Sequence, residues 1–206
     1  MKRLNFVLAF DVFGTILDLS SIIQEFRRKQ LEYTWLLTIL GKFATFEEIT
    51  KLALQSTLTS RGEMEKFNEE LNKWNNLRSH SDAKYLQDMS EIVDIYALSN
   101  GSMKEVSMHL EHNGLLKFFK GVVSAEEVKV YKPSPLVYKH FMKSVTPNAY
   151  LVSSNPFDVI GAKNAGMGAI YVNRFNQPID PLGYQPDLVV KDFHELHDWL
   201  KRKLVS

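Results

Sequence analysis

Short apolar runs alternate with helical segments through the second half of this sequence, and this alternation constrains the fold more than any other feature. The apolar runs cover residues 92–98, 121–124, 150–152, 169–173 and 188–190. The helical segments cover residues 104–112, 135–143, 157–165 and 193–204. Strands that alternate with helices are typical of a parallel sheet with helices on both faces. The sequence therefore predicts a Rossmann-like, doubly wound α/β core.

A further apolar run, residues 6–10, lies far upstream of the others and ends at Asp11, with Gly14 close behind. It has the length and content of a buried parallel strand. Ligands of open α/β sheets bind just beyond the carboxyl ends of the strands, so Asp11 is placed for chemistry. An aspartate at a strand-to-helix turn can also be a helix cap. Asp11 alone leaves both interpretations open.

Between this first strand and the others, roughly residues 17–85 show helical periodicity and no strand signal. The spacing of a capping box occurs twice, at Ser21 with Gln24 and at Thr45 with Glu48. This is more helix than one connection between parallel strands needs. We therefore expect a helical cap domain, residues 17–86, inserted into a split core domain of residues 1–16 and 87–206.

Composition narrows the class of protein. The chain has 206 residues and is 45% hydrophobic, enough for a packed core without metals or disulfides. Its 25 lysines and arginines nearly balance 24 acidic residues, which gives no electrostatic case for binding nucleic acid or an acidic membrane surface. The absence of cysteine excludes disulfides, thiolate metal sites and cysteine nucleophiles. The expected ligand is a small molecule.

Lys2 and Arg3 precede the first apolar run, as at the start of a signal peptide. Asp11 interrupts that run after five residues, whereas a secretory apolar region needs about 7 to 15. No segment approaches the roughly 18 apolar residues of a membrane span. We therefore expect a soluble, cytoplasmic protein with no membrane partner.

Polar side chains follow the ends of the predicted strands. They are Ser99 and Asn100, before Gly101, and then Ser153, Asn155 and Asp158. Each group alone also fits ordinary architecture, S-N-G as a turn and Asp158 as an acid in the first turn of a helix. Because the carboxyl ends of parallel strands lie at one edge of a sheet, we expect these side chains to meet Asp11.

Two cations are candidates for the same edge. Lys132 lies in the run V-Y-K-P-S, with Tyr138 six residues later on a helix. A lone lysine is usually solvated, but a cation at the sheet edge would hold carboxylates ionised and attract an anion. Arg27 and Leu31 share one helical face in the cap, where an arginine could bind an anion. Periodicity leaves open whether Arg27 or Arg28 faces the core, and Tyr138 fits the core equally well.

Four short motifs occur along the predicted core. They are D-V-F-G-T at residues 11–15, S-N-G at 99–101, K-P at 132–133 and S-S-N-x-x-D at 153–158. Their order and spacing resemble those of the haloacid dehalogenase superfamily. The run R-R-K-Q-L-E-Y-T-W at 27–35 resembles the cap signature of the (S)-2-haloacid dehalogenases themselves, as does V-Y-K-P at 130–133. The resemblance extends over nearly the whole chain and implies hydrolysis of (S)-2-haloalkanoic acids to (R)-2-hydroxyalkanoic acids.

Position 13 argues against a phosphatase. Phosphatases of this superfamily carry a second aspartate two residues after the nucleophile, which protonates the leaving alcohol, whereas this chain has Phe13. A halide leaves without protonation, so a dehalogenase needs no acid there. The third motif offers Asp158 as its only carboxylate, beside Ser153, Ser154 and Asn155, too little charge for a strong magnesium site. We therefore expect neither a metal nor a cofactor.

The resemblance implies a two-step hydrolysis on Asp11. Its carboxylate attacks C2 of the haloacid, expels halide and forms an ester, which water then cleaves. A carboxylate is already ionised at neutral pH, so the first step needs no base. By the same resemblance, Thr15 braces the nucleophile, and the side chains that orient Asp11 and activate the water are Lys132, Tyr138, Ser153, Asn155 and Asp158.

The resemblance also implies the contacts of the substrate. Arg27 from the cap and Asn100 from the core bind the departing halide. Ser99 and the backbone after Asp11, at Val12, hold the substrate carboxylate. The apolar wall around the alkyl group consists of Phe13, Leu31, Phe46 and Phe157. The expected partners are therefore a small 2-haloacid and a halide, with no nucleic acid.

Two positions depart from the pattern of relatives. Arg28 stands where relatives carry a neutral side chain, and Phe157 where tryptophan is frequent. The charge near the halide and the size of the substrate therefore stay open. Relatives are often homodimers, which makes a homodimer an expectation here too. Two other functions also stay open: a phosphomonoester hydrolase of the same superfamily, and a non-enzymatic binding protein that uses the cap face around Trp35.

Overall fold

A six-stranded sheet forms the centre of the structure, a computed structural model that describes residues 3–205. The strands lie in the order β3-β2-β1-β4-β5-β6, and every neighbouring pair runs parallel. They are β1 (Val7–Phe10), β2 (Asp94–Ser99), β3 (Gly121–Ser124), β4 (Ala149–Ser153), β5 (Gly168–Val172) and β6 (Leu188–Val190). The predicted doubly wound α/β core is confirmed.

Strand β1 occupies the middle of the sheet because its side chains are apolar on both faces. Leu8, Ala9 and Phe10 are fully buried, and β2 and β4 pair with the strand on either side. Burial of a side chain the size of leucine or phenylalanine contributes about 1.5–3 kcal/mol. The backbone N–H of Asp11 extends the pairing by donating to the carbonyl of Val152 at 2.9 Å. The ends of β1 and β4 therefore lie at one edge of the sheet.

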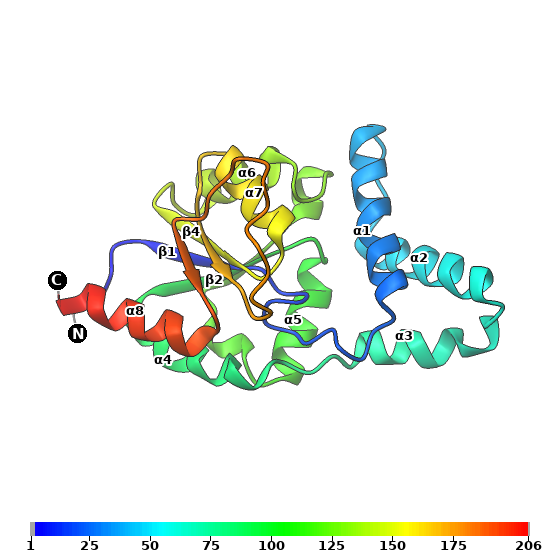
Figure 1. The fold of residues 1–206 in the computed structure, drawn as a ribbon, viewed down its shortest axis with the longest axis horizontal. Helices are drawn as coiled ribbons and strands as arrows, with labels where there is room; N and C mark the ends of the chain where they lie inside the picture. Colours follow the sequence, from blue (N-terminus) through cyan, green and yellow to red (C-terminus); the bar gives the residue numbers. More distant parts are fainter. Residues whose placement is uncertain (1–2, 206) are drawn as a thin grey trace.

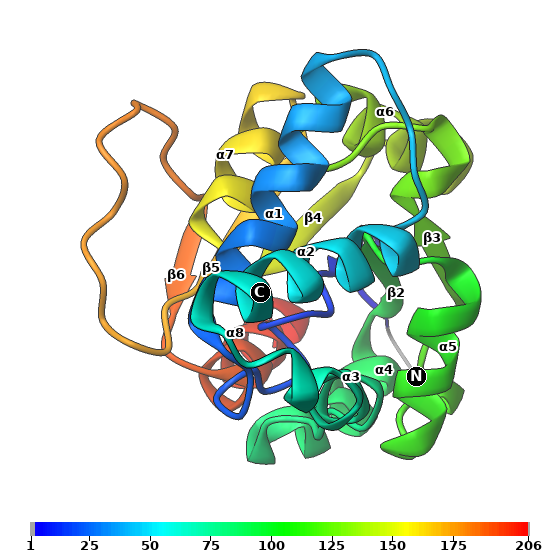
Figure 2. The same cartoon turned by 90° about the vertical axis from the view of Figure 1, so that its right-hand side faces the viewer.

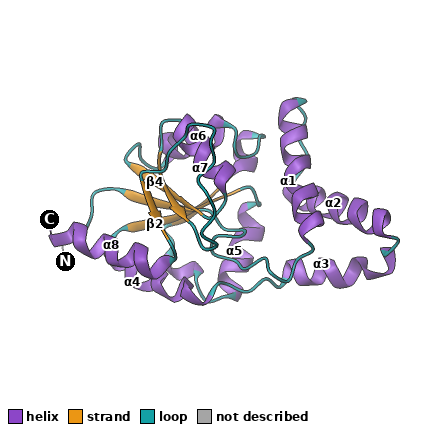
Figure 3. Cartoon of the chain, viewed as in Figure 1, coloured by secondary structure: helices purple, strands orange, loops and turns teal. Residues whose placement is uncertain are grey.

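Helices cover both faces of this sheet (Figures 1 and 3). On one face lie α6 (Pro135–Ser144) and α7 (Pro156–Asn164), and on the other lie α4 (Tyr85–Ile92), α5 (Met103–His112) and α8 (Phe193–Val205). The short turns η3 (Leu116–Phe118) and η4 (Ala125–Val128) precede and follow β3. Within residues 3–205, no helix has both the length and the hydropathy needed to cross a membrane.

Three further helices stand beside the sheet, on the side toward which the chain leaves β1 (Figure 1), and Figure 2 looks onto them. They are α1 (Gln24–Ile39), α2 (Phe46–Arg61) and α3 (Phe67–Asn75), with the turn η1 (Met64–Lys66) before α3. The predicted capping box at the start of α2 is confirmed. Thr45 Oγ1 accepts from the backbone N–H of Glu48, and the Glu48 carboxylate accepts from that of Thr45.

Two local predictions are wrong. The expected capping box of Ser21 and Gln24 does not form, because Gln24 is itself the first residue of α1 and Ile23 occupies the capping position. The strand expected over residues 92–98 starts at Asp94, because α4 continues through Ile92 and buries that side chain on the helix. A short apolar run fits either kind of element, so the pattern does not separate them.

The chain passes between the sheet and the helices α1, α2 and α3 twice, once after β1 and once after α3. These two connecting segments pair with each other. Leu17 forms an antiparallel bridge with Ser79. The turn η2 (Ser81–Lys84) follows the second segment and leads into α4, which packs against α8. The division into a core of residues 1–16 and 87–206 and a cap of residues 17–86 stays a prediction.

Candidate active site

Asp11 lies at the sheet edge where β1 ends, and it is buried. Its Oδ2 accepts hydrogen bonds from Thr15 Oγ1 and Asn155 Nδ2, both at 2.7 Å. Its Oδ1 accepts one from Lys132 Nζ at 3.1 Å. The next helix starts only at Gln24, so Asp11 is not a helix cap. The sheet edge thus holds a carboxylate whose two oxygens are bound by three side chains.

Lys132 is buried, which excludes the interpretation of a solvated surface lysine. Its ammonium group donates to Asp11 Oδ1, to Asp158 Oδ2 at 2.8 Å and to the carbonyl of Leu98 at 2.7 Å. Burial opposes the charged form of Lys132, but the charges of Asp11 and Asp158 outweigh this effect, so its pKa lies above the usual value. The lysine is therefore a fixed cation that joins two carboxylates.

Asp158 lies in the first turn of α7, as predicted, and is also part of the site. Its Oδ1 accepts a hydrogen bond from Tyr138 Oη at 2.5 Å. Burial raises the pKa of Asp158, while the charge of Lys132 lowers it. Gly161 makes this arrangement possible, because a Cβ there would lie 2.6 Å from Tyr138 Oη. No motif in the sequence indicates Gly161, because its role depends on the packing of α6 against α7.

The turn after β2 joins the same group. Ser99 and Asn100 are buried, and Asn100 Oδ1 accepts from the backbone N–H of Lys132 at 2.9 Å. Ser99 Oγ accepts from the N–H of Gly101 at 3.1 Å. A Cβ on Gly101 would lie 2.8 Å from the ring of Phe13, so glycine lets the turn approach that ring. The S-N-G motif is thus both an ordinary turn and a neighbour of Lys132 and Phe13, the residues beside Asp11.

The loop after β4 is bound to the loop after β1. The hydroxyl of Thr15 donates to Asp11 and accepts from the backbone N–H of Ser154 at 2.8 Å. Ser153 Oγ accepts from the N–H of Asn155 at 3.1 Å. These contacts orient the two side chains, Thr15 and Asn155, that bind Oδ2 of Asp11.

Arg27 approaches the sheet edge from α1, whereas Arg28 is exposed, and this settles which arginine faces the core. Its Nη2 lies 3.4 Å from the carbonyl oxygen of Phe13. Burial lowers the pKa of Arg27 to about 10, against the charges of Asp11 and Glu105, which raise it. The guanidinium therefore remains a cation at neutral pH.

Phe13 is buried among three other rings. Its centroid lies 4.8 Å from that of Trp74, 5.6 Å from that of Phe46 and 5.5 Å from that of His109. Phe46 is a predicted member of the apolar wall, but Trp74 and His109 are not. Trp74 follows ordinary helical periodicity and His109 belongs to no motif, so neither gives a functional signal in the sequence.

The other two predicted wall residues, Leu31 and Phe157, are partly exposed. The ring of Phe157 packs edge-on against that of Trp35, with centroids 5.5 Å apart. These two rings line an apolar surface groove together with Ile39, Pro135 and Leu182. The contact of Leu31 and Phe157 with a substrate stays a prediction.

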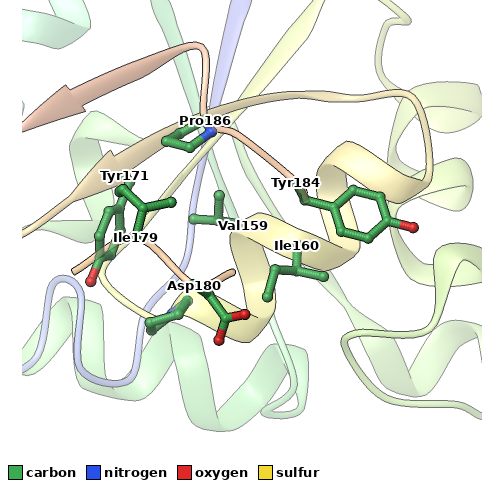
Figure 4. Close-up of a pocket in the computed structure, with 8 residues that line it drawn as sticks. Val159, Ile160, Tyr171, Ile179, Asp180, Tyr184 and Pro186 are labelled. Carbon is green, nitrogen blue, oxygen red and sulfur yellow. The ribbon is translucent and has the colours of Figure 1, made fainter. Parts of the chain in front are cut away.

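A smaller pocket lies between α7 and the loop after β5 (Figure 4). Its lining residues include Val159, Ile160, Tyr171 and Tyr184. None of the predicted site residues lines it. The candidate site is therefore the polar cluster around Asp11 and not this pocket.

Glu105 on α5 is a further residue of this region, and no motif in the sequence indicates it. Its Oε1 accepts a hydrogen bond from Trp74 Nε1 at 3.0 Å, and its Oε2 is buried without a hydrogen-bond partner among residues 3–205. Burial raises the pKa of Glu105 to about 7, although the Trp74 hydrogen bond and the charge of Arg27 lower it. This carboxyl therefore gains or loses its proton near neutral pH, beside the aromatic cluster.

Glu105→Gln is expected to stabilise the protein above pH 7 and to remove part of its pH dependence. The pKa of Glu105 is about 7 in the folded state, against 4.5 as its ordinary value. The folded state therefore binds more protons in this window, and the free energy of unfolding falls as pH rises through it. Across this window the free energy of unfolding of the parent protein falls by about 2 kcal/mol, after allowance for partial exposure of the Glu105 side chain. Glutamine keeps the acceptor for Trp74.

Urea unfolding at pH 5 and pH 8 measures this difference. The matched control is Glu111→Gln, an exposed position on the same helix, which should change the free energy of unfolding by less than about 0.5 kcal/mol. A Glu105→Gln protein that loses as much stability as its parent between the two pH values would contradict the assignment.

The assembled site has a definite chemical capacity. Asp11 can attack an electrophile, and Arg27 can bind an anion that leaves. Lys132 and Asp158 lie next to the attacking group, whereas Phe13 offers no proton to a leaving alcohol. Across the part of the chain that the structure describes, no three histidine, aspartate or glutamate side chains form a group that could hold a metal ion.

Known proteins resemble this chain along its length. The model of the haloacid dehalogenase-like hydrolase family matches residues 8–172. The (S)-2-haloacid dehalogenase H-109 of Pseudomonas putida is 31% identical over 216 residues, 94% of this chain and 96% of the relative. The (S)-2-haloacid dehalogenase of Xanthobacter autotrophicus is 35% identical over 82% of this chain and 75% of the relative.

Solved structures agree with these sequence comparisons. The structure of the L-2-haloacid dehalogenase from Xanthobacter autotrophicus with chloropropionic acid covalently bound has a TM-score of 0.85 and 28% identity to this chain. The superposed region covers 98% of this chain and 99% of the chain in that structure. The family that the motifs predict is confirmed, and the chain belongs to the haloacid dehalogenase-like hydrolases.

Proposed function

We propose that this chain hydrolyses (S)-2-haloalkanoic acids to (R)-2-hydroxyalkanoic acids through an ester on Asp11. One observation carries the proposal: a buried carboxylate held by Lys132, Thr15 and Asn155 lies beside Phe13, where an acid for a leaving alcohol would be needed. A reaction that uses a carboxylate nucleophile and expels a halide fits this combination. The names of the relatives, (S)-2-haloacid dehalogenases, support the choice of substrate.

In the first step, a carboxylate oxygen of Asp11 attacks C2 of the haloacid from the side opposite the halogen. Oδ1 accepts one hydrogen bond, from Lys132, and Oδ2 accepts two, so Oδ1 is the less occupied oxygen and the one with a lone pair open for the attack. The carbon–halogen bond breaks, and the halide leaves with the electron pair between Arg27 and Asn100. Attack from the opposite side inverts C2, which converts an (S) substrate into an (R) product.

In the second step, water attacks the carboxyl carbon of Asp11 and the ester opens. The oxygen that came from Asp11 leaves as the product hydroxyl, and the water oxygen stays on Asp11. Asp158, with its carboxylate oriented by Lys132 and Tyr138, takes one proton of the water and returns it to the leaving alkoxide. The second proton of the water passes to solvent as the carboxylate of Asp11 forms again. Ser153 contributes by fixing Asn155, which binds Asp11.

The substrate contacts form part of the same proposal. Ser99 and the backbone at Val12 hold the substrate carboxylate, and the alkyl group lies against an apolar wall of Phe13, Leu31, Phe46 and Phe157. The close ring contacts of Phe13 and Phe46 support this wall. The site then lies between a core of residues 1–16 and 87–206 and a cap of residues 17–86.

The enzyme is further proposed to be a cytoplasmic homodimer. A chain without cysteine needs no oxidising compartment. Exposed apolar side chains at the end of α1, among them Leu36, Ile39 and Leu40, support an interface between copies. Sedimentation of the purified protein measures the oligomeric state.

The test of function is an assay with separate enantiomers. We expect chloride release from (S)-2-chloropropanoate, formation of (R)-lactate, and no release from the (R) enantiomer. p-Nitrophenyl phosphate with and without magnesium is the comparison substrate. Magnesium-dependent phosphate release without chloride release would favour a phosphomonoester hydrolase. A folded protein that turns over neither substrate would favour a binding protein.

A further inference from the structure

Two buried polar side chains connect α2 with Arg27 on α1. The exposed fractions of Gln30 and Thr50 are 0% and 1%. Gln30 Oε1 accepts a hydrogen bond from Arg27 Nη1 at 2.6 Å, and Gln30 Nε2 donates to Thr50 Oγ1 at 2.6 Å. Thr50 Oγ1 donates to the carbonyl of Phe46 at 2.7 Å. The contacts form one continuous relay from the backbone of α2 to the guanidinium.

The chemistry of the two ends fixes the direction of this relay. The carbonyl of Phe46 only accepts hydrogen bonds, so the hydroxyl proton of Thr50 is used there. The oxygen of Thr50 must then accept from the amide group of Gln30. The amide oxygen of Gln30 is left for Arg27, whose guanidinium only donates. The reversed amide would place its N–H groups against those of Arg27 and its oxygen against the oxygen of Thr50, so Gln30 has one orientation.

Arg27 needs such a restraint to bind an anion in one place. A free arginine side chain has about 2 kcal/mol of rotamer entropy. Its contact with the carbonyl of Phe13 is long, at 3.4 Å, whereas its contact with Gln30 is short and charge-assisted. Gln30 therefore holds one arm of the guanidinium and leaves other N–H groups free for an anion.

We propose that Gln30 is a positioning residue for halide departure: it holds the guanidinium of Arg27 in the orientation that binds the leaving halide, and Thr50 holds Gln30. The inference rests on the proposed dehalogenase function. Gln30 and Thr50 themselves contact neither the substrate nor the nucleophile. A purely structural alternative is that the pair only ties α1 to α2.

Two substitutions separate positioning from structural support. Gln30→Met keeps the length of the side chain and removes both hydrogen bonds. Thr50→Val keeps the shape and removes the hydroxyl, and its matched control is Thr50→Ser, which keeps the hydroxyl. For each protein we would measure kcat and KM for (S)-2-chloropropanoate, the inhibition constant of chloride, and the thermal midpoint.

We expect Gln30→Met to lower kcat about 10-fold and to weaken chloride inhibition about as much, with a smaller change in KM. Thr50→Val should shift both quantities in the same direction by about 3-fold, and Thr50→Ser should restore them. The double variant Gln30→Met/Thr50→Val should resemble Gln30→Met alone, because Thr50 acts through Gln30.

Three results would overturn the inference. The first is a lower thermal midpoint in Gln30→Met or Thr50→Val with parental kcat and parental chloride inhibition. The second is equal behaviour of Thr50→Val and Thr50→Ser, and the third is additive losses in the double variant. A parent enzyme that releases no halide overturns the proposed function and the inference together. Any of the three results, obtained with a parent enzyme that releases halide normally, overturns the inference alone.

Discussion

Asp11→Asn is expected to abolish halide release and to leave the fold intact. The amide of asparagine is not a nucleophile, so no ester forms, and we expect kcat to fall about 10⁴-fold or more. Asn fits the space of the buried carboxylate, and Lys132 keeps its contact with Asp158. Chloride release from (S)-2-chloropropanoate, with a circular dichroism spectrum of each protein, measures both parts of the prediction.

The control for this variant is Asp18→Asn on the same connecting segment. The carboxylate of Asp18 accepts from the N–H of Ser20, away from the cluster around Asp11. Its replacement should leave kcat within about 2-fold of the parent, as is usual for substitutions outside an active site. Residual activity above one tenth of the parent in Asp11→Asn would show that another group attacks the substrate.

Lys132→Met should lower the free energy of unfolding by about 3–5 kcal/mol at pH 8, because it leaves two buried carboxylates without their shared cation. The ammonium lies 3.1 Å from Asp11 and 2.8 Å from Asp158. In the variant, the pKa of Asp158, already raised by burial, rises further. The folded state then binds more protons than the unfolded state, so stability increases as pH falls.

Urea unfolding at pH 5 and pH 8 tests this prediction, with a smaller loss expected at pH 5. Lys163→Met is the matched control, because Lys163 pairs with Asp187 at 2.7 Å but both side chains are partly exposed. Lys163→Met should lower the free energy of unfolding by less than about 1 kcal/mol. Equal losses in the two variants, or a greater loss at pH 5 for Lys132→Met, would mean that Lys132 does not neutralise the two carboxylates.

The sequence predicts the polar part of the site because of a general property of parallel sheets. Asp11, Asn100 and Asn155 each follow the end of a strand, and strands that run in one direction bring these ends together. Lys132 follows β3 through a short turn and returns to the same edge. This prediction needs only the direction of the strands and not the packing of side chains. The observed contacts agree with it.

Packing between distant segments decides the rest. The orientation of Arg27, the hydrogen bond between Trp74 and Glu105 and the relay through Gln30 all depend on how α1, α2 and α3 lie against their neighbours. Helical periodicity gives a face of a helix but not its partner. The error at Ile92 has a similar origin, since its side chain is buried at the end of α4 and a buried apolar residue has the same character in the sequence on a helix as on a strand.

Isotope labelling in a single turnover shows whether an ester forms on Asp11. Excess enzyme is mixed with (S)-2-chloropropanoate in H₂¹⁸O, and the product and the peptide that contains Asp11 are analysed by mass spectrometry. An ester on Asp11 predicts that the ¹⁸O atom enters Asp11 and that the first lactate formed carries none. Lactate that carries ¹⁸O in the first turnover, with Asp11 unlabelled, would mean that water attacks C2 directly and that no ester forms on Asp11.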